Sequence, residues 1–310
     1  MMRIVYILVG GEAPTGGHKM IVRHVEALTR MGFEAVAYVP PGDPEPRWFK
    51  HDAPIQTGGE LRDTDILVIP EDAFGFLKQF AFSKHRKVVF CQNTFRAASG
   101  GIGRLTAEEM ARYREFIACS NACAAWIGKY LPGSSVDMIP AFADERRFKP
   151  LTKQRVIACT PRKRQLESRN VIFMFSRLFE SSARWKWSLV QSAAEEEVAA
   201  AFGGAAVFLS LSRLEGLPIT TLEAMACGCV VAGFTGIGGR EYATSANGFW
   251  VEEDDCESCA LALSRAVRLA EAGGPALRAM SSAAMKTASD WSHANFLREL
   301  ESYWRRSIHS

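Results

Sequence analysis

Short apolar runs and longer amphipathic segments alternate along the whole chain. Each apolar run has the length of a buried strand and is bounded by Gly, Pro or charged residues. The runs predict strands at 4–9, 33–39, 66–69, 87–91, 116–120, 136–140, 155–160, 187–191, 205–211 and 230–232.

Between these runs, apolar residues recur at helical spacing. Ile21, Val25 and Leu28, for example, would share one face of a helix. This periodicity predicts helices at 20–31, 74–82, 165–179, 195–202, 218–227 and 293–306. Regular alternation of strands and helices is typical of parallel sheets covered by helices on both faces, so we expect an α/β protein.

The composition agrees with a globular protein that has two cores. The chain has 310 residues, more than one typical domain, and 48% of them are hydrophobic. A net charge of +3 is too small to predict a nucleic-acid partner. The amino-terminal apolar run is too short for a signal sequence or a membrane span, so we expect a cytoplasmic protein.

Two acidic residues, Glu215 and Glu223, stand out in an otherwise apolar segment. The predicted strand 205–211 places Glu215 in a strand-to-helix loop. Pro218 suits the first turn of the helix, where its missing N–H costs nothing, and Gly228 would end that helix. A helix N-terminus attracts phosphate, and carboxylates accept hydrogen bonds from hydroxyls. A sugar nucleotide carries both groups.

This segment resembles the signature of the retaining glycosyltransferases of family 4. The resemblance rests on the E-x7-E spacing of Glu215 and Glu223, the Glu-Gly-Leu-Pro opening, the Leu-Glu-Ala-Met-Ala core and a later Gly-Gly-x-Glu turn at 238–241. It implies the GT-B class: α/β, with two Rossmann-like, doubly wound parallel-sheet domains facing across a cleft. It also implies that Glu215 faces the donor sugar's hydroxyls and that Glu223 binds the ribose hydroxyls.

The resemblance also suggests where the domains divide, because 142–150 is similar to the family's interdomain passage. We expect an N-terminal, acceptor-side domain at 1–148 and a C-terminal nucleotide-sugar-binding domain at 149–290. The final helix, in 291–310, is expected to pack back on the first domain. The stretch 162–215 is short for the family, as if one strand–helix unit were missing or reduced.

Three consecutive cations, Arg162, Lys163 and Arg164, follow a predicted strand directly. Cations there would neutralise charge that builds on a diphosphate leaving group, although a solvated basic turn is the alternative. We assign Glu215, Lys163 and Arg162 as catalytic residues. The predicted donor-binding residues are Glu223, Gly216, Leu217, Pro218, Ile219, Thr220, Arg164, Gly238, Gly239 and Arg240.

In the first half, the glycine-rich loop 10–18 would allow backbone to approach a ligand closely. Gln92 and Asn93 follow a predicted strand where several relatives place a His. Neither amide can act as a general base at neutral pH, but both can bond a sugar hydroxyl. The residues expected on the acceptor side of the cleft are Gly16, Gly17, His18, Gln92 and Asn93.

Neither a metal nor a cofactor is expected. Asp63-Thr64-Asp65 has D-x-D spacing, but it directly precedes a strand and predicts a turn. The eight cysteines lack paired metal-ligand spacing, so we expect reduced thiols. As the resemblance implies, cations and helix dipoles would hold the leaving diphosphate. The donor-side ligand is then a nucleoside diphosphate sugar alone.

A weak peripheral membrane contact at the inner face of the membrane was also considered. Lys19, Arg23 and Arg30 would suit anionic lipid, but their spacing only partly places them on one helix face, which favours a solvated surface. The sequence carries no signal for an oligomeric state.

The sequence thus predicts a retaining, metal-independent, hexosyltransferase-like enzyme, as in polysaccharide biosynthesis. It would move a sugar to a hydroxyl of a glycan, a glycolipid or a small metabolite. A catalytically silent sugar-nucleotide-binding or scaffold protein is the alternative, since the basic motif is compressed and the His is missing. A nicotinamide dehydrogenase is disfavoured, because neither half joins a Gly fingerprint to an acidic residue about twenty positions later.

Overall fold

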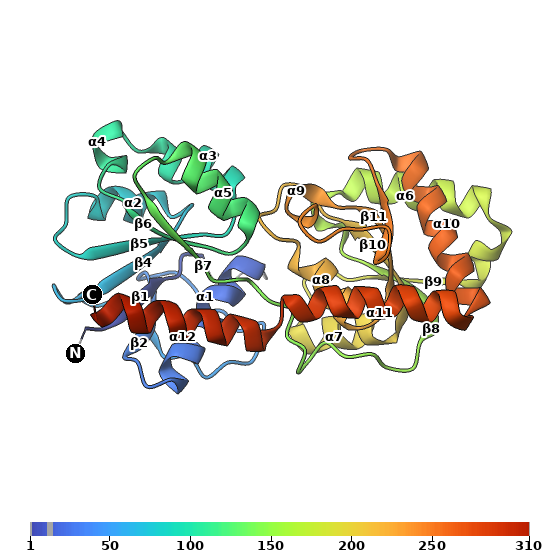
Figure 1. Cartoon of the computed structure of the whole chain (residues 1–310), viewed down its shortest axis with the longest axis horizontal. Helices are drawn as coiled ribbons and strands as arrows, with labels where there is room; N and C mark the ends of the chain where they lie inside the picture. Colours follow the sequence, from blue (N-terminus) through green and yellow to red (C-terminus); the bar gives the residue numbers. More distant parts are fainter. Residues whose placement is uncertain (1, 11–14, 310) are drawn as a thin grey trace. The chain divides into compact units, whose positions relative to one another are not determined.

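The computed structural model describes residues 2–10 and 15–309. They form two compact units. The first comprises the described residues up to Ala141 together with those from Ala294 onward, and the second is Phe142–His293. Each unit is built on one parallel sheet with helices against it, so the expectation of an α/β protein is confirmed (Figure 1).

The first sheet has seven parallel strands in the order β3-β2-β1-β4-β5-β6-β7. Its strands are β1 (Ile4–Ile7), β2 (Ala35–Val39), β3 (Ile55–Thr57), β4 (Ile66–Pro70), β5 (Arg86–Cys91), β6 (Glu115–Ala118) and β7 (Ser135–Met138). The strand order reverses between β1 and β4. Ligands of doubly wound sheets bind outside the carboxyl ends of the strands at such a reversal.

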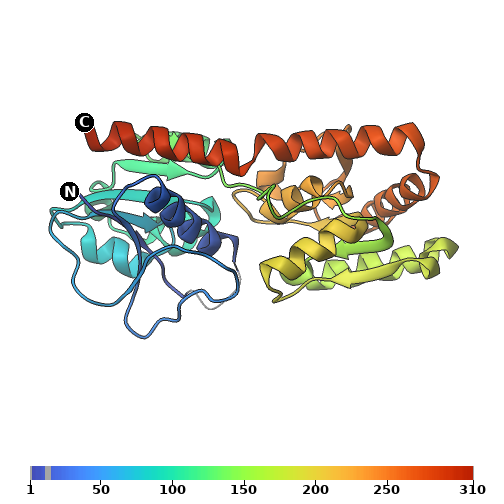
Figure 2. The same cartoon turned by 90° about the horizontal axis from the view of Figure 1, so that it is seen from below.

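Six helices and a short 3₁₀ turn accompany this sheet. They are α1 (Gly16–Arg30), α2 (Phe74–Phe80), α3 (Thr94–Gly100), η1 (Ile102–Arg104), α4 (Ala107–Met110), α5 (Asn121–Tyr130) and α12 (His293–His309). The carboxyl-terminal helix α12 packs beside α1, with the Phe296 ring 4.9 Å from the His24 ring. Its Trp304 is fully buried and contacts Tyr6 of β1, so α12 completes the core of the first unit (Figure 2).

The second sheet has five parallel strands in the order β12-β11-β10-β8-β9. They are β8 (Gln154–Cys159), β9 (Lys186–Leu189), β10 (Ala205–Leu211), β11 (Val230–Phe234) and β12 (Gly248–Val251). The second sheet thus has two strands fewer than the first. Here the strand order reverses between β8 and β10.

The helices of the second unit cover both faces of its sheet. They are η2 (Pro161–Lys163), α6 (Gln165–Leu178), η3 (Glu180–Arg184), α7 (Glu195–Gly204), α8 (Ile219–Ala226), α9 (Gly236–Gly239), α10 (Cys256–Ala272) and α11 (Gly274–Asp290). Helices α6 and α10 pack together over one face, where Phe175 and Leu263 are fully buried. Helices α7, α8 and α11 pack over the other.

Asp63-Thr64-Asp65 forms a turn at the entry to β4, as the sequence predicted. Asp65 is buried at the entry to β4, where its carboxylate accepts from Arg3 Nε at 3.0 Å and Arg3 Nη2 at 2.6 Å. It also accepts from the Arg62 amide at 2.8 Å. Its lone pairs are therefore used to fix the turn. Across the described residues, no group of three or more His, Cys, Asp or Glu side chains is placed to hold a metal ion.

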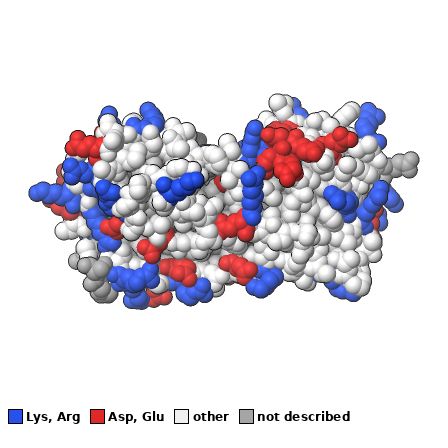
Figure 3. Space-filling model, turned by 45° about the horizontal axis from the view of Figure 1, so that its top comes forward, with Lys and Arg blue, Asp and Glu red and all other residues white. Residues whose placement is uncertain are grey.

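The three cations considered for a membrane contact do not form one surface patch. Arg23 is buried against Glu26 at 2.8 Å and stacks over Phe49, because the chain around Lys50 folds over this face of α1. Among the described residues, no helix is both long and apolar enough to cross a bilayer. On the face in Figure 3, basic side chains are spread over the surface, whereas acidic side chains also gather in one patch on the right of the view.

Candidate active site

Lys163 and Glu215 meet at the point where the strand order of the second sheet reverses. Lys163 ends the 3₁₀ turn after β8, and Glu215 lies in the loop after β10. Because neighbouring parallel strands end at the same edge, residues 52 positions apart come into contact, and Lys163 Nζ donates to Glu215 Oε1. Both side chains remain partly exposed, at 34% and 21%. A ligand can therefore reach this pair.

The loop after Glu215 leads into helix α8, which begins at Ile219 with Pro218 as its N-cap. We had expected Pro218 inside the first turn. Its φ of −75° and ψ of +81° place it just outside, and no side chain caps the helix. An uncapped helix start leaves amide donors and the positive end of the helix dipole for an anion. At the other end, Gly228 has φ +73° and stops the helix as predicted.

Residues around this helix start differ in exposure. Gly216, Leu217 and Pro218 are buried, whereas Ile219 and Thr220 are half-buried. Glu223 lies on α8 with 4% exposure. Beneath the loop, the Thr221 hydroxyl lies 3.1 Å from that of Ser210 and 3.3 Å from that of Ser212. This hydroxyl network holds the start of α8 against the end of β10, and no sequence pattern predicted it.

The glycine turn of α9 braces the Glu215 loop instead of offering its amides to a ligand. Gly238 N donates to Glu215 O at 3.1 Å, and Gly236 N donates to Glu253 Oε1 at 2.9 Å. A Cβ on Gly238 would lie 2.3 Å from Gly216 O, so only glycine fits this approach. The Gly238 amide is therefore already used within the loop, and the expected contact of Gly238 with the donor stays a prediction. Gly239 is buried near Pro218.

Arg164 does not face a ligand either. It is 1% exposed and its Nε donates to Ser212 O at 2.9 Å. Its two terminal nitrogens pair with Glu253 and Asp254 after β12. The guanidinium also lies 4.4 Å from the Phe234 ring centre. This geometry corrects the assignment of Arg164 as a donor contact: it is a positioning residue that ties three strand ends together.

Two of the predicted cations remain exposed at this edge. The side chains of Arg162 and Arg240 make no hydrogen bond or ion pair within the described part of the chain. Sequence reasoning missed a third cation, Arg213, which is 46% exposed and lies 3.5 Å from Glu167. Its position two residues before Glu215 was the available signal. Together with Lys163, these side chains provide positive charge beside the uncapped start of α8.

In the first unit, the predicted acceptor-side residues gather at the carboxyl edge of the sheet. Gly16, Gly17 and His18 form the first turn of α1, because Thr15 caps the helix through the His18 amide at 3.2 Å. A Cβ on Gly17 would meet the Gln92 side-chain amide at 3.4 Å, so these two positions are neighbours. Residues 11–14 of the predicted loop lie outside the described residues.

Asn93 has a structural role in addition to the expected one, since its side-chain nitrogen can still donate to a sugar hydroxyl. Its side-chain oxygen accepts from the amides of Phe95 at 3.0 Å and Arg96 at 3.3 Å, as the N-cap of α3. Since the capping oxygen is used for the helix, it is not available to a sugar hydroxyl. Asparagine directly before a helix was the signal for this.

Glu71, a carboxyl group that contacts the Gln92 amide, was not predicted as a site residue. It is 3% exposed at the end of β4, and its Oε2 accepts from the Gln92 amide at 3.0 Å. Burial and, to a smaller extent, the charge of Asp72 raise its pKa, the Gln92 hydrogen bond partly offsets both effects, and the resulting pKa is about 8. Glu71 is therefore protonated at neutral pH and holds Gln92 in place.

Replacing Glu71 by glutamine is expected to change how stability depends on pH. Because the pKa of about 8 lies above the ordinary 4.5, the parent is fully stabilised below pH 4.5 and loses stability as the pH rises toward 8. Glu71→Gln cannot ionise and should keep that stability, on the order of a few kcal/mol at pH 8. Urea unfolding at pH 4.5, 6 and 8 measures this, with the exposed Glu108→Gln as control. Parallel pH curves for E71Q and the parent would contradict it.

Comparisons with known proteins agree with this geometry. Residues 184–287, which contain Glu215 and Glu223, match the family model described as glycosyl transferases group 1. The chain is 28% identical over 269 residues to an alpha-1,6-glucosyltransferase of Actinobacillus pleuropneumoniae serotype 7 (strain AP76), covering 81% of this chain and 79% of the relative.

Solved structures match the fold over almost the whole chain. A sucrose-phosphate synthase from Thermosynechococcus elongatus superimposes with a TM-score of 0.72 at 13% identity, covering 100% of both chains. HepE of Anabaena, solved with UDP, also gives 0.72 at 13% identity, covering 98% of this chain and 100% of that one. The two parallel-sheet domains thus have the GT-B fold, as the sequence predicted.

Proposed function

We propose that this protein is a glycosyltransferase that moves a sugar from a nucleoside diphosphate sugar to an acceptor hydroxyl. The observation that carries the proposal is the Lys163–Glu215 pair beside the uncapped start of α8. It supplies a cation and helix amides for a diphosphate, next to a carboxylate for sugar hydroxyls. The glycosyl transferases group 1 match spans Glu215 and α8, which supports the same conclusion.

The proposed reaction retains the anomeric configuration. The bond between the anomeric carbon and the diphosphate oxygen breaks while the acceptor oxygen bonds that carbon on the same face. The acceptor proton passes to the departing phosphate oxygen. Glu215 orients the sugar through its hydroxyls, and Lys163, followed by Arg162, balances the charge that develops on the phosphate. Glu223 holds the ribose hydroxyls.

We favour UDP-glucose as the donor to try first. The relative from Actinobacillus is named a glucosyltransferase, and the HepE structure contains UDP. We propose that transfer needs no metal, since Lys163, Arg162, Arg213 and Arg240 supply the positive charge near the diphosphate position. Full activity in excess chelator is the expected result. The proposed acceptor is a glycan, a glycolipid or a small metabolite with a free hydroxyl.

A catalytically silent sugar-nucleotide-binding protein is the second candidate. The observation that favours it lies in the first unit, where Gln92 stands at the end of β5 and its neighbour Asn93 caps α3. Such a protein would bind nucleotide but turn over no donor. Binding alone therefore does not decide between the two, and donor hydrolysis does.

The deciding experiment is thermal unfolding with UDP, GDP, ADP and CMP without metal. We expect one nucleotide, at about one hundred times its Kd, to stabilise the protein by about 2.7 kcal/mol, and Glu223→Ala to lose this effect. Because Glu223 is buried, Glu223→Gln serves as a milder variant, and the exposed Glu257→Ala as control.

Release of glucose from UDP-glucose by the parent then separates the enzyme from the silent binder. If no nucleotide shifts the transition, or if E257A loses the shift together with E223A, the assigned donor site is wrong.

A further inference from the structure

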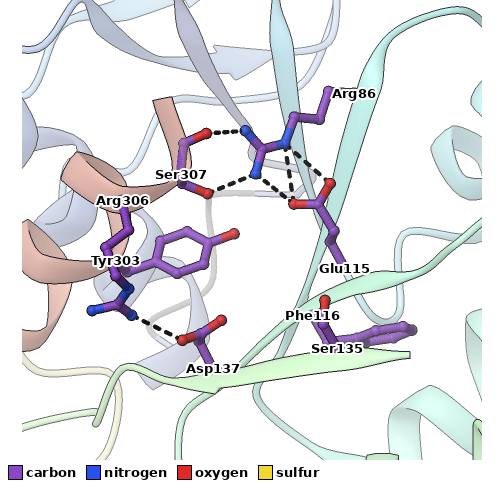
Figure 4. Close-up of a pocket in the computed structure, with 8 residues that line it drawn as sticks. All are labelled: Arg86, Glu115, Phe116, Ser135, Asp137, Tyr303, Arg306 and Ser307. Atoms are coloured by element: carbon purple, nitrogen blue, oxygen red, sulfur yellow. Dashed lines mark hydrogen bonds and ion pairs between the residues drawn. The ribbon is translucent and has the colours of Figure 1, made fainter. Parts of the chain in front are cut away.

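A pocket of about 250 Å³ in the first unit is lined by polar groups that are paired with one another (Figure 4). Arg86, at the start of β5, donates to Glu115 at 2.7 Å and to the Ser307 hydroxyl at 2.6 Å. Arg306 donates to Asp137 of β7 at 3.0 Å. Ser307 and Arg306 belong to α12, so these contacts hold the end of that helix on the sheet. They leave no unpaired charge among the groups named here.

The cluster of hydroxyl groups beneath α8 is different, because free donors lie directly above it. The cluster consists of Ser210, Ser212, Thr221 and Tyr242, and each residue is at most 7% exposed. Thr221 is the third residue of α8. The amides of Thr220 and Thr221 bond no acceptor within the described residues. Two donors at the helix start therefore remain for an anion.

The hydrogen bonds of this hydroxyl cluster have a fixed direction, because a carbonyl oxygen only accepts. Ser210 Oγ donates its single proton to Phe234 O at 2.7 Å. In the contact of 3.1 Å between the Ser210 and Thr221 hydroxyls, Thr221 is therefore the donor. Ser210 lies in β10, and Phe234 ends β11. The Thr221 hydroxyl thus anchors α8 to one strand directly and to the next strand through Ser210.

Thr221 carries the anchoring hydroxyl and one of the two free amides on the same residue. With its hydroxyl held by Ser210, the Thr221 amide has a fixed place relative to the end of β10. Glu215 lies in the loop that follows this same strand. The anchor therefore sets the free amides of the helix start relative to the carboxylate that contacts Lys163.

Tyr242 supports the helix start from another element. It lies shortly after α9, and its hydroxyl donates to the carbonyl of Pro218, the N-cap of α8, at 3.3 Å. The Leu222 amide reaches the same carbonyl at only 3.4 Å, so the phenol supplements a long first bond of the helix. The Tyr242 backbone is itself held by Asn247, whose Nδ2 donates to the Tyr242 carbonyl at 2.7 Å.

We propose that Thr221 is a positioning residue for the proposed transfer reaction, with Tyr242 as its second support. The Thr221 hydroxyl holds the free amides of α8 at the place where charge develops on the leaving diphosphate. Donors that are already in place do not have to reorganise as the reaction proceeds. The inference rests on the proposed function, since it assigns a role within the same donor site.

The test compares Thr221→Val, which keeps the shape of the side chain without the hydroxyl, with Thr221→Ser, which keeps the hydroxyl. Losing the hydrogen bond should lower kcat for UDP-glucose hydrolysis about ten-fold in T221V. The donor KM should change less than about three-fold, because the leaving group carries more charge in the transition state than in the bound donor. T221S should recover most of the rate.

Two further variants test the role independently. Tyr242→Phe should lower kcat about three-fold, a smaller effect because its bond to Pro218 is long. Thr29→Val makes the same chemical change in the first unit, where the Thr29 hydroxyl donates to Val25 O within α1 at 2.9 Å. This control should keep the kcat of the parent.

Thermal unfolding of the same variants separates positioning from folding. A purely structural role would lower the unfolding midpoint of T221V and leave kcat of the folded protein at the parent's value. That result, equal kcat values for T221V and T29V, or no recovery by T221S would overturn the proposal. If the parent itself neither binds UDP nor consumes UDP-glucose, the proposed function fails and this inference fails with it.

Discussion

Replacing Lys163 by alanine is expected to lower kcat for glycosyl transfer by about 100-fold or more. Lys163 Nζ is the cation that contacts Glu215, and its exposure of 34% lets it reach a donor phosphate without a change in the fold. The negative charge on the leaving diphosphate is larger in the transition state than in the bound donor, so kcat should fall more than the affinity for the donor. Initial rates with UDP-glucose and the acceptor, at saturating donor, measure this.

Two further variants sharpen the interpretation of K163A. Lys186→Ala removes an exposed lysine at the start of β9 and should leave kcat unchanged. The double variant Lys163→Ala, Glu215→Ala should lose much less than the product of the two single losses, because the side chains contact each other and act on one substrate. A K163A rate within three-fold of the parent would remove Lys163 from the mechanism.

Replacing Arg164 by alanine is expected to destabilise the second unit by about 3–5 kcal/mol. The guanidinium is almost completely buried, and its loss leaves Ser212 O, Glu253 and Asp254 without their cation. For a unit of this size, the midpoint of thermal unfolding should fall by roughly 10 °C. Calorimetry of the purified variant measures it.

Lysine should not restore stability at position 164. A single ammonium cannot reach a carbonyl and two carboxylates in the planar arrangement that a guanidinium provides. Arg169→Ala, at an exposed position on the same helix, is the matched control and should have little effect. If R164A and R169A unfold at the same temperature, Arg164 does not hold the strand ends together.

The strands in the centre of each sheet were predictable because they are buried on both faces and are therefore continuous apolar runs. β10 (Ala205–Leu211) has the predicted bounds, and α8 begins one residue later than expected. The pattern gave no signal for β3 and β12, which lie at sheet edges. β3 has only one apolar residue among three, and β12 is a four-residue strand that begins with a glycine, so neither forms a recognisable apolar run. The alanine-rich helix α11 was missed since alanine gives a weak periodic signal.

Site residues could be predicted only where they belong to a short sequence motif or directly follow a predicted strand. The spacing of Glu215 and Glu223 and the position of Lys163 after a strand are such local features. The partners of Arg164 lie up to 90 residues away in the sequence. Its burial therefore depends on the order of the strands in the sheet, which could not be predicted from the sequence pattern. Glu71 shows the same limit, since a glutamate at the end of an apolar run is usually exposed.

The connections of Glu253 have a consequence for engineering donor preference. This one carboxylate accepts from Gly236 and pairs with Arg164, which in turn holds the carbonyl of Ser212. The loops that follow β8, β10, β11 and β12 are therefore connected to one another by hydrogen bonds and ion pairs. A chimaera that takes only the Glu215 loop from a relative would therefore lose contacts with the other three loops. A graft intended to change donor preference should exchange the loops after all four strands together.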